Sequence, residues 1–144
     1  MSALVIKNYQ GTPLHSEVKK IRQIVFIDEQ KVSEELEWDD EDKISTHLVV
    51  YQDNKAIASA RYYKIGHITY IGRMAVLLDY RRQGVGYLLL KKCIDDIKKT
   101  NTQKIIIHAQ ETVLQFYQQQ GFIEKGEKFY EADIAHKKMI LELT

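Results

Sequence analysis

Apolar residues recur along this chain with two spacings, one typical of helices and the other typical of strands. Within residues 84–99, apolar positions fall three, four, seven, eight and eleven residues after Gly86. This spacing places them on one face of an amphipathic helix. A shorter run of the same spacing predicts another helix over residues 14–28.

A longer apolar stretch, residues 45–78, is broken twice by short polar or glycine-containing turns. Asp53 and Asn54 form the first break, and Gly66 and His67 form the second. Two-residue breaks of this composition favour tight hairpin turns. The stretch therefore predicts a meander of three strands.

The remaining apolar runs complete an alternation of strands and helices. Residues 104–110, KIIIHAQ, are typical of a strand buried on both faces and hence parallel to its neighbour. With the preceding helix and strand, this run predicts a right-handed βαβ crossover. Residues 3–9 predict a first strand, and residues 111–120 predict a helix that Gly121 closes.

The C-terminal part, residues 122–143, predicts two further strands, of which residues 137–143 form the last. No repeat, low-complexity stretch or linker divides the chain. We therefore expect a single domain, 1–144, of the α/β class, with a mixed central sheet of six to seven strands flanked by about four helices.

Composition excludes several classes of protein. Hydrophobic residues make up 44% and charged residues 28% of the 144 positions, which are ordinary globular values. No apolar run approaches the roughly 20 residues of a spanning helix, and the N-terminus lacks a basic, apolar leader, so we expect a cytoplasmic protein with no membrane partner. The single Cys93 excludes an internal disulfide, and five scattered histidines indicate no metal site.

Charge is distributed unevenly. Residues 34–42, EELEWDDED, hold seven of the 20 acidic residues and no lysine or arginine, so the rest of the chain is basic. A basic surface suits nucleic acid or a phosphorylated small molecule, but no long Lys/Arg run or aromatic-interleaved basic motif is present. The pattern favours a small anion and no nucleic-acid partner.

The candidate anion site is DYRRQGVG, residues 79–86, between a predicted strand and the best predicted helix. Unpaired N–H groups and the helix dipole attract anions to such a turn, and glycines there let an oxygen approach the backbone. Arginine side chains would add donors. Leu89 does not fit the dinucleotide pattern GxGxxG, and Glu127 and Lys128 break a P-loop pattern that begins at Gly121. A solvated turn with incidental arginines is the alternative.

Two motifs in this order resemble the GNAT superfamily of acyl-CoA N-acyltransferases. GRMAVLLDYRRQGVGYLLL, residues 72–90, is similar to its strand, Arg/Gln-x-x-Gly-x-Gly/Ala and helix. AQETVLQFYQQQGF, residues 109–122, is similar to its Asn-x-x-Ala-x-x-Phe/Leu-Tyr-x-x-x-Gly-Phe. Residues 25–42 with His47, and residues 129–139, resemble a small bacterial subfamily typified by ElaA. The resemblance implies a GNAT-like sheet whose parallel strand pair splays apart around the βαβ crossover.

The resemblance also implies a cofactor, acetyl-CoA, and the residues that bind it. The pyrophosphate would lie on the turn, the pantetheine arm along the preceding strand, and Tyr117 near the thioester sulfur as general acid. Gln110 stands where many members have Asn. The implied cofactor-binding residues are Met74, Ala75, Val76, Arg81, Arg82, Gln83, Gly84, Val85, Gly86 and Gln110.

The implied reaction is transfer of an acetyl group to a primary amine of a small molecule or peptide, by direct attack in a ternary complex. Many members carry a base on the strand before the turn, but HITYIGRM, residues 67–74, has no carboxylate. Glu29, His47, His108, the acids near Trp38, or water are the open alternatives. A catalytically weak acyl-CoA sensor or partner-binding module is the rival hypothesis.

The acidic segment suggests a binding site for a cationic acceptor, in which the ring of Trp38 would make a cation–π contact. Glu29, Trp38, Asp39 and His47 are the candidate acceptor-binding residues. The alternative is a solvated acidic loop in which Trp38 is a packed anchor. The oligomeric state, monomer or homodimer, stays open.

Overall fold

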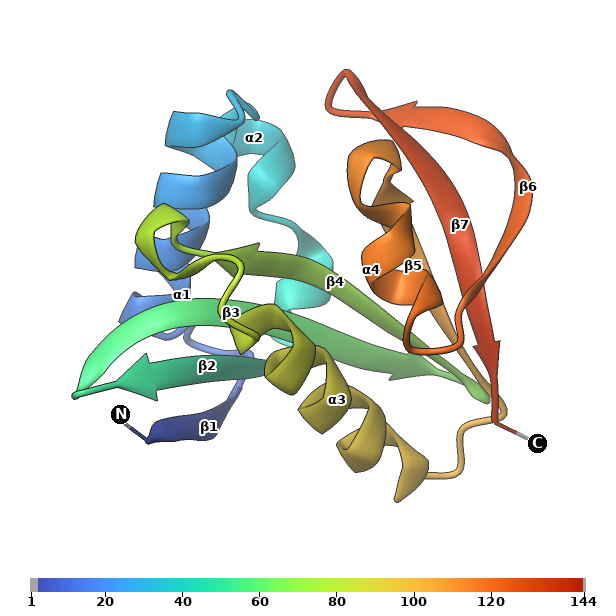
Figure 1. Ribbon diagram of the computed structural model, residues 1–144, viewed down its shortest axis with the longest axis horizontal. Coiled ribbons are helices and arrows are strands. Elements are labelled where there is room, and N and C mark those ends of the chain that lie inside the picture. The colour runs from blue at the N-terminus through green and yellow to red at the C-terminus, as the bar shows by residue number, and fades with distance from the viewer. Residues whose placement is uncertain (1–2, 144) are drawn as a thin grey trace.

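The computed structural model describes residues 3–143 and contains one mixed seven-stranded sheet (Figure 1). The strand order is β1-β2-β3-β4-β5-β7-β6, and only β4 and β5 run parallel to each other. The predicted α/β class, the meander and the parallel crossover strand are confirmed. The strands are β1 (Leu4–Gln10), β2 (Thr46–Gln52), β3 (Lys55–Ile65), β4 (Ile68–Val76), β5 (Lys104–Gln110), β6 (Ile123–Glu131) and β7 (Ile134–Glu142).

The helices differ in detail from the sequence-based expectation. The helix predicted over residues 14–28 begins at Ser16, and its second half is π-helical. The helix predicted over residues 111–120 shrinks to a 3₁₀ turn and one short α-helix, and Gly121 ends it at φ +98° as expected. The helical segments are α1 (Ser16–Arg22), η1 (Gln23–Glu29), α2 (Glu34–Glu37), η2 (Asp40–Lys43), η3 (Leu78–Tyr80), α3 (Val85–Lys98), η4 (Glu111–Val113) and α4 (Leu114–Gln118).

Local interactions explain the N-terminal helix. The His15 side chain caps the Glu17 N–H at 3.1 Å, so the first helical residue is Ser16. In η1 the Gln30 N–H donates to the Val25 carbonyl, five residues back. This wider turn places both Val25 and Phe26 among the buried residues. π-helical turns occur often beside functional sites.

Two apolar clusters cover opposite faces of the sheet. Successive residues of β2 alternate between them: Leu48 and Val50 join one cluster, and Val49 joins the other. The first cluster contains the apolar side of α3 and Tyr117 of α4, and the second contains the apolar sides of α1 and η1. The predicted helix face is confirmed, because the buried residues of α3 are Val85, Leu89, Leu90, Cys93, Ile94 and Ile97.

The sheet opens between β4 and β5. The parallel pairing covers only Ile68–Ile71 against 104–107, after which β4 stays paired with β3 and β5 stays paired with β7. The β3–β4 register shifts between Ser59 and Arg61, and Arg73 of β4 adopts φ +52° at this bulge. The bulge bends β4 away from β5. The splayed strand pair is therefore present, and its two strands diverge in Figure 1.

Within residues 3–143, no helix is both long and apolar enough to cross a membrane.

Gly11 lets the end of β1 pass close to the backbone of η2. A Cβ at this position would lie 2.5 Å from the Lys43 carbonyl oxygen and still closer to that of Asp42. We expect Gly11→Ala to lower the free energy of unfolding by about 1–3 kcal/mol, because backbone atoms must move to admit the methyl group. Urea denaturation at neutral pH measures this change.

Gly72→Ala is the matched control, since its Cβ would meet only Arg61 Nε, at 4.0 Å. We expect its unfolding free energy to stay within about 0.5 kcal/mol of wild type. Equal losses in the two variants would contradict the close approach at Gly11.

Candidate functional site

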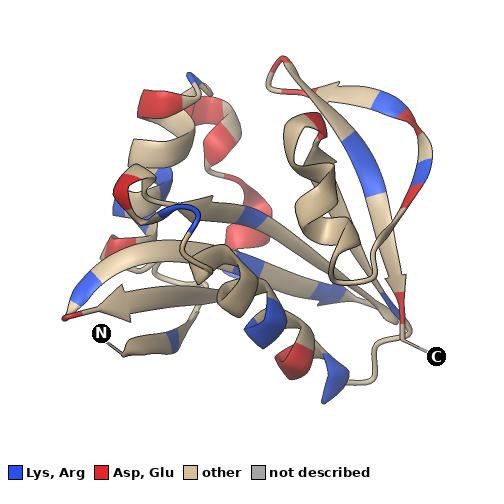
Figure 2. Cartoon of the chain, in the orientation of Figure 1, with Lys and Arg blue, Asp and Glu red and all other residues tan. Residues whose placement is uncertain are grey.

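The turn before α3 has the backbone geometry of an anion site. Gly84 is the N-cap of α3 at φ +84°, and Arg82 also adopts a left-handed conformation, at φ +61°. Gly84 is exposed, and a Cβ there would meet nothing within 4 Å, so its role is conformational. The first N–H groups of α3 therefore point out of an open turn, which is basic in Figure 2.

Gly86 has a different role from the one the sequence suggested. A Cβ at Gly86 would lie 3.3 Å from Cζ of Phe116 and 3.7 Å from a methyl carbon of Val76. Its missing side chain lets α4 and β4 approach the first turn of α3. The open space at Gly84 agrees with the interpretation that an oxygen can approach the backbone there, while the missing side chain of Gly86 also serves packing against Phe116 and Val76.

Arg81 lies across the end of β4 and binds two groups. Its Nε donates to the Val76 carbonyl at 2.7 Å, and its two Nη atoms donate to the carboxylate of Glu29 at 2.8 and 2.7 Å. The hydrogen bond from Arg81 lowers the pKa of Glu29, which makes this carboxylate a weaker proton acceptor. Both Nη atoms of Arg81 engage the Glu29 carboxylate beside the turn before α3, which argues against Glu29 as the general base.

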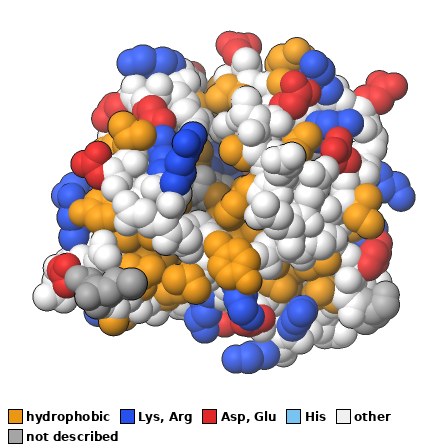
Figure 3. Space-filling view, viewed as in Figure 1, with side chains coloured by type: hydrophobic (Ala, Val, Ile, Leu, Met, Phe, Trp, Pro, Cys, Tyr) orange, Lys and Arg blue, Asp and Glu red, His pale blue; other side chains and the backbone are white. Residues whose placement is uncertain are grey.

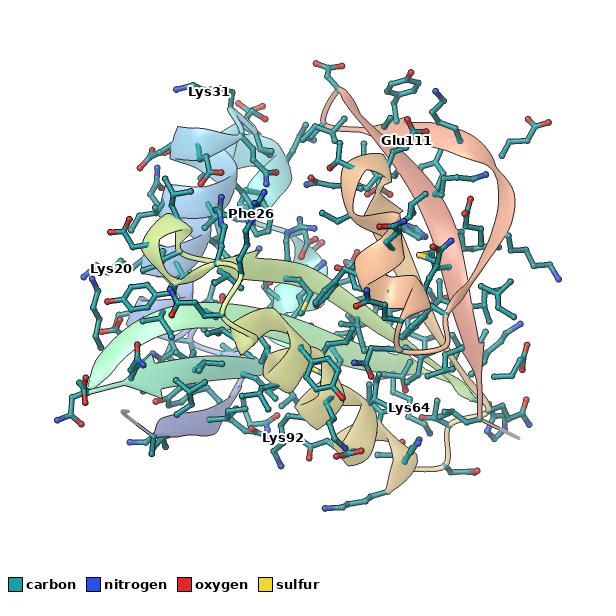
Figure 4. The ribbon with its side chains drawn as sticks, in the orientation of Figure 1. Lys20, Phe26, Lys31, Lys64, Lys92 and Glu111 are labelled. Atoms are coloured by element: carbon teal, nitrogen blue, oxygen red, sulfur yellow. The ribbon has the colours of Figure 1, made fainter. Side chains whose placement is uncertain are left out.

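The strand residues that are expected to contact the cofactor lie at the opening between β4 and β5. Met74, Ala75 and Val76 follow the last residue of β4 that pairs with β5, so this part of β4 has no strand neighbour on that side among residues 3–143. Figure 3 shows a hollow on this face, with basic and hydrophobic side chains around it. The side chains of Lys31 and Glu111 lie on its two sides (Figure 4).

Gln110 lies at the far end of β5 and contacts the other side of the opening. Its Nε2 donates to Oε1 of Gln30, the residue that follows η1, at 2.8 Å. The two amides connect β5 to the segment after η1. Gln110 therefore reaches the opening, but its side chain is already bonded within the chain.

Tyr117 lies in the apolar cluster beneath α3. Its ring makes edge contacts with Phe116 and Phe122, at centroid distances of 5.0 and 6.1 Å. Burial raises the pKa of its phenol, so the hydroxyl keeps its proton through neutral pH. The Tyr117 side chain is buried among the apolar residues of this cluster.

The acidic segment is bonded to arginines of the same chain. Arg22 donates to Glu37 at 2.7 Å and to Asp42 at 2.6 Å, and Arg61 donates to Asp39 at 2.9 Å and to Asp42 at 2.8 Å. Arg73 donates to Glu37 and Asp39 at 3.1 and 3.2 Å. Figure 2 shows this acidic stretch on α2 and η2. The three arginines were missed because they are distant in sequence.

Trp38 and His47 belong to the same internal network. The guanidinium of Arg22 lies 4.9 Å from the centroid of the Trp38 ring, so the expected cation–π face is occupied by the chain itself. His47 is buried, and its Nε2 lies 3.0 Å from the Asp42 carbonyl oxygen. Burial lowers the pKa of His47. Asp39 is paired with arginines as well, so Trp38, Asp39 and His47 form a structural cluster. This corrects the expectation that the acidic segment is free to bind a cationic acceptor.

His108 is the remaining candidate base, and it has an acidic partner. Its Nδ1 lies 2.8 Å from Oε1 of Glu131, and the ring of Phe129 packs edge-on at 5.1 Å. Glu131 was not predicted, because it belongs to another strand and no sequence pattern connects it with His108. Within the described residues, no cluster of three or more His, Cys, Asp or Glu side chains could hold a metal ion.

Two surface cavities lie away from the opening. One, of about 320 Å³, lies between α3 and the end of β7, and the other, of about 330 Å³, lies between α1 and the β2–β3 turn. Neither is lined by the turn residues 81–84. Because the anion donors and the free strand edge converge elsewhere, we place the candidate site at the opening.

The splayed parallel strand pair thus lies beside the N-terminus of α3 in a mixed α/β fold. The family model described as the acetyltransferase (GNAT) domain matches residues 15–143 of this chain. The chain belongs to the GNAT acetyltransferase family.

Individual proteins resemble the chain over most of its length. The protein YyaT of Bacillus subtilis (strain 168) is 31% identical over 131 residues, which cover 89% of this chain and 88% of YyaT. Escherichia coli ElaA has a TM-score of 0.86 and 23% identity, over 97% of this chain and 100% of ElaA. A GNAT family acetyltransferase from Elizabethkingia anophelis, crystallised with acetyl-CoA bound, has a TM-score of 0.72 and 18% identity, over 97% and 98% of the two chains.

The buried carboxylates predict loss of stability in acid. Burial opposes the charges of Asp39 and Asp42, but the hydrogen bonds and charges of Arg61 and Arg22 outweigh it, and the pKa of each carboxyl falls. Their stabilisation is therefore complete above the ordinary aspartate pKa and is lost as the pH falls through the lowered folded value. Urea denaturation should show a decline that begins below about pH 5.

The variant Asp42→Asn tests the source of this decline. It should cost about 3–5 kcal/mol at pH 7, because it removes one partner from a buried ion network, and it should flatten the acid slope. Asp95→Asn, which removes an exposed partner of Lys91, should leave both the free energy of unfolding at pH 7 and its decline in acid nearly unchanged. An unchanged acid slope in Asp42→Asn would contradict the assignment.

Proposed function

We propose that this protein is an acetyl-CoA-dependent N-acetyltransferase that transfers the acetyl group to a primary amine by direct attack in a ternary complex. The observation that carries the proposal is that a free edge of β4 ends at the open N-terminus of α3. A thioester cofactor with a pyrophosphate and an amide-bearing arm needs both features. The acetyl-CoA bound to the Elizabethkingia anophelis relative supports the same cofactor.

Each part of the cofactor has a matching group. The pyrophosphate would accept hydrogen bonds from the N–H groups of residues 82–86 and from Arg81. The pantetheine arm would pair with Met74–Val76 as an added strand. The thioester carbonyl would then lie near the start of this segment, where a backbone N–H can stabilise the developing oxyanion.

Tyr117 would donate a proton to the leaving thiolate. When the amine attacks, the bond from carbon to sulfur breaks and the thiolate needs a proton. A phenol is protonated at neutral pH and can donate that proton, or a strong hydrogen bond, to the thiolate.

A non-catalytic acyl-CoA sensor on the same fold is the second candidate function. The observation that favours it is the absence of a carboxylate on β4, Ile68–Val76. Such a module would bind the cofactor equally well and would transfer nothing.

Glu29 and the cofactor should compete for Arg81. Both Nη atoms of Arg81 bind Glu29, so a pyrophosphate has to displace this carboxylate. Glu29→Gln should therefore tighten CoA binding about fivefold, the equivalent of about 1 kcal/mol for a partly exposed ion pair. Isothermal titration calorimetry at pH 7.5 measures the dissociation constant.

Asp28→Asn is the control, because it removes one negative charge from the neighbouring position, where Asp28 accepts a hydrogen bond from Gln23. We expect its affinity for CoA to match wild type. An equal gain in both variants would indicate a general charge effect and would contradict the competition.

Measuring turnover distinguishes the transferase hypothesis from the sensor hypothesis. Acetyl-CoA should raise the melting temperature of the wild type, and ATP or NAD should not. CoA release should then be measured with spermidine, glucosamine, tyramine and a lysine-containing peptide as acceptors. Tyr117→Phe keeps the ring contacts, so it should bind acetyl-CoA as wild type does and turn over about 100-fold more slowly.

Binding without release of CoA in any wild-type reaction would support the sensor. Equal turnover in wild type and Tyr117→Phe would refute Tyr117 as the acid. No change in melting temperature with acetyl-CoA would refute cofactor binding itself.

A further inference from the structure

His108 stands where the two parallel strands separate. Ile107 is the last residue of β5 that pairs with β4, opposite Ile71, so His108 is the first residue beyond the pairing. Ile107 and Ala109 point into the apolar cluster of α3, and strand alternation therefore directs His108 to the opposite face. Gly72, the next residue of β4, has no side chain to cover this position.

The other base candidates are bound elsewhere. Glu29 is held by both Nη atoms of Arg81, and His47 is buried against the Asp42 carbonyl. The side chain of His108 is 44% exposed, so its ring can meet a substrate. Because the cofactor arm would follow β4 from the α3 side, an amine would approach the thioester from the face of His108.

Glu131 fixes which ring nitrogen of His108 is free. The hydrogen bond from His108 lowers the pKa of Glu131, so this carboxylate is ionised and can only accept. Nδ1 of His108 therefore carries the proton, and Nε2 presents a lone pair. Among residues 3–143, Nε2 has no hydrogen-bond partner.

The surroundings hold the pair in place. Phe129 packs edge-on against His108 and stacks on His136 at a centroid distance of 5.9 Å. The charge of Arg73 also acts on Glu131, His136 stands beside Phe129, and Lys138 of β7 is the register partner of His108. The carboxylate of Glu131 is thus the acidic group in hydrogen-bond contact with this ring.

We propose that His108 is the general base of the acetyl transfer and that Glu131 is its positioning residue. The inference rests on the proposed transferase function and adds the proton acceptor that β4 lacks. As the amine nitrogen bonds to the thioester carbon, its proton passes to Nε2 of His108. The bond from carbon to sulfur breaks, the thiolate takes the proton of Tyr117, and solvent returns the proton from His108 to Tyr117.

Two measurements on the full-length protein test this pair. Long-range ¹H–¹⁵N correlation spectra report the tautomer of His108 without any need for turnover, and we expect the Nδ1–H form in wild type and its loss in Glu131→Gln. Kinetics with the four amines named above should show His108→Ala about 100-fold lower in kcat, with unchanged acetyl-CoA affinity and no acidic limb in its pH profile.

Glu131→Gln should lower kcat about tenfold, because the His108 ring loses the carboxylate that orients it. Glu124→Gln is the matched control: Glu124 also lies on β6 and pairs with Lys137 of β7 at 3.2 Å, away from His108. Its kcat and pH profile should equal those of wild type.

The outcomes separate the two proposals. An Nε2–H tautomer, or turnover by His108→Ala equal to wild type, would overturn His108 as the base and leave the transferase function standing. Acetyl-CoA binding with no acetylation of any amine by wild type would overturn the transferase function and the base together.

Discussion

The pairing between β4 and β5 stops after four residue pairs, and the rest of the site depends on this break. A continuous parallel pair would satisfy the backbone of Met74–Val76 and leave no edge for a ligand. The bulge at Arg73 keeps β4 paired with β3 while it turns away from β5. The same divergence brings the end of β4 to the turn before α3, where Gly84 leaves the helix N-terminus open.

The internal ion network supports this geometry from the other face. Arg73 adopts a left-handed conformation that is costly for a non-glycine residue, and its guanidinium binds Glu37 and Asp39. Arg22 and Arg61 hold the same acidic segment against the sheet. The acidic segment, which the sequence suggested as a binding site for a cation, thus binds Arg73 at the bulge. The pair of His108 and Glu131 lies outside this network.

The features that the sequence predicted are those determined by neighbours in the chain. The helix face of α3 follows from spacing within a few residues, and the parallel pairing of β5 with β4 follows from the crossover rule. Contacts such as Arg22 with Asp42, or His108 with Glu131, depend on register and on residues 20 or more positions apart, which no local pattern encodes. The π-helical conformation of η1 was missed because its five-residue hydrogen bonds leave the apolar spacing of a helix almost unchanged.

The central claim is that the free edge of β4 and the turn before α3 bind one acyl-CoA molecule together. Hydrogen–deuterium exchange with and without acetyl-CoA tests it directly, since both segments are backbone sites. The account predicts slower exchange of the amides of residues 74–76 and 82–86 in the same titration. Unchanged exchange in these segments, or protection confined to the cavity between α3 and the end of β7, would contradict it.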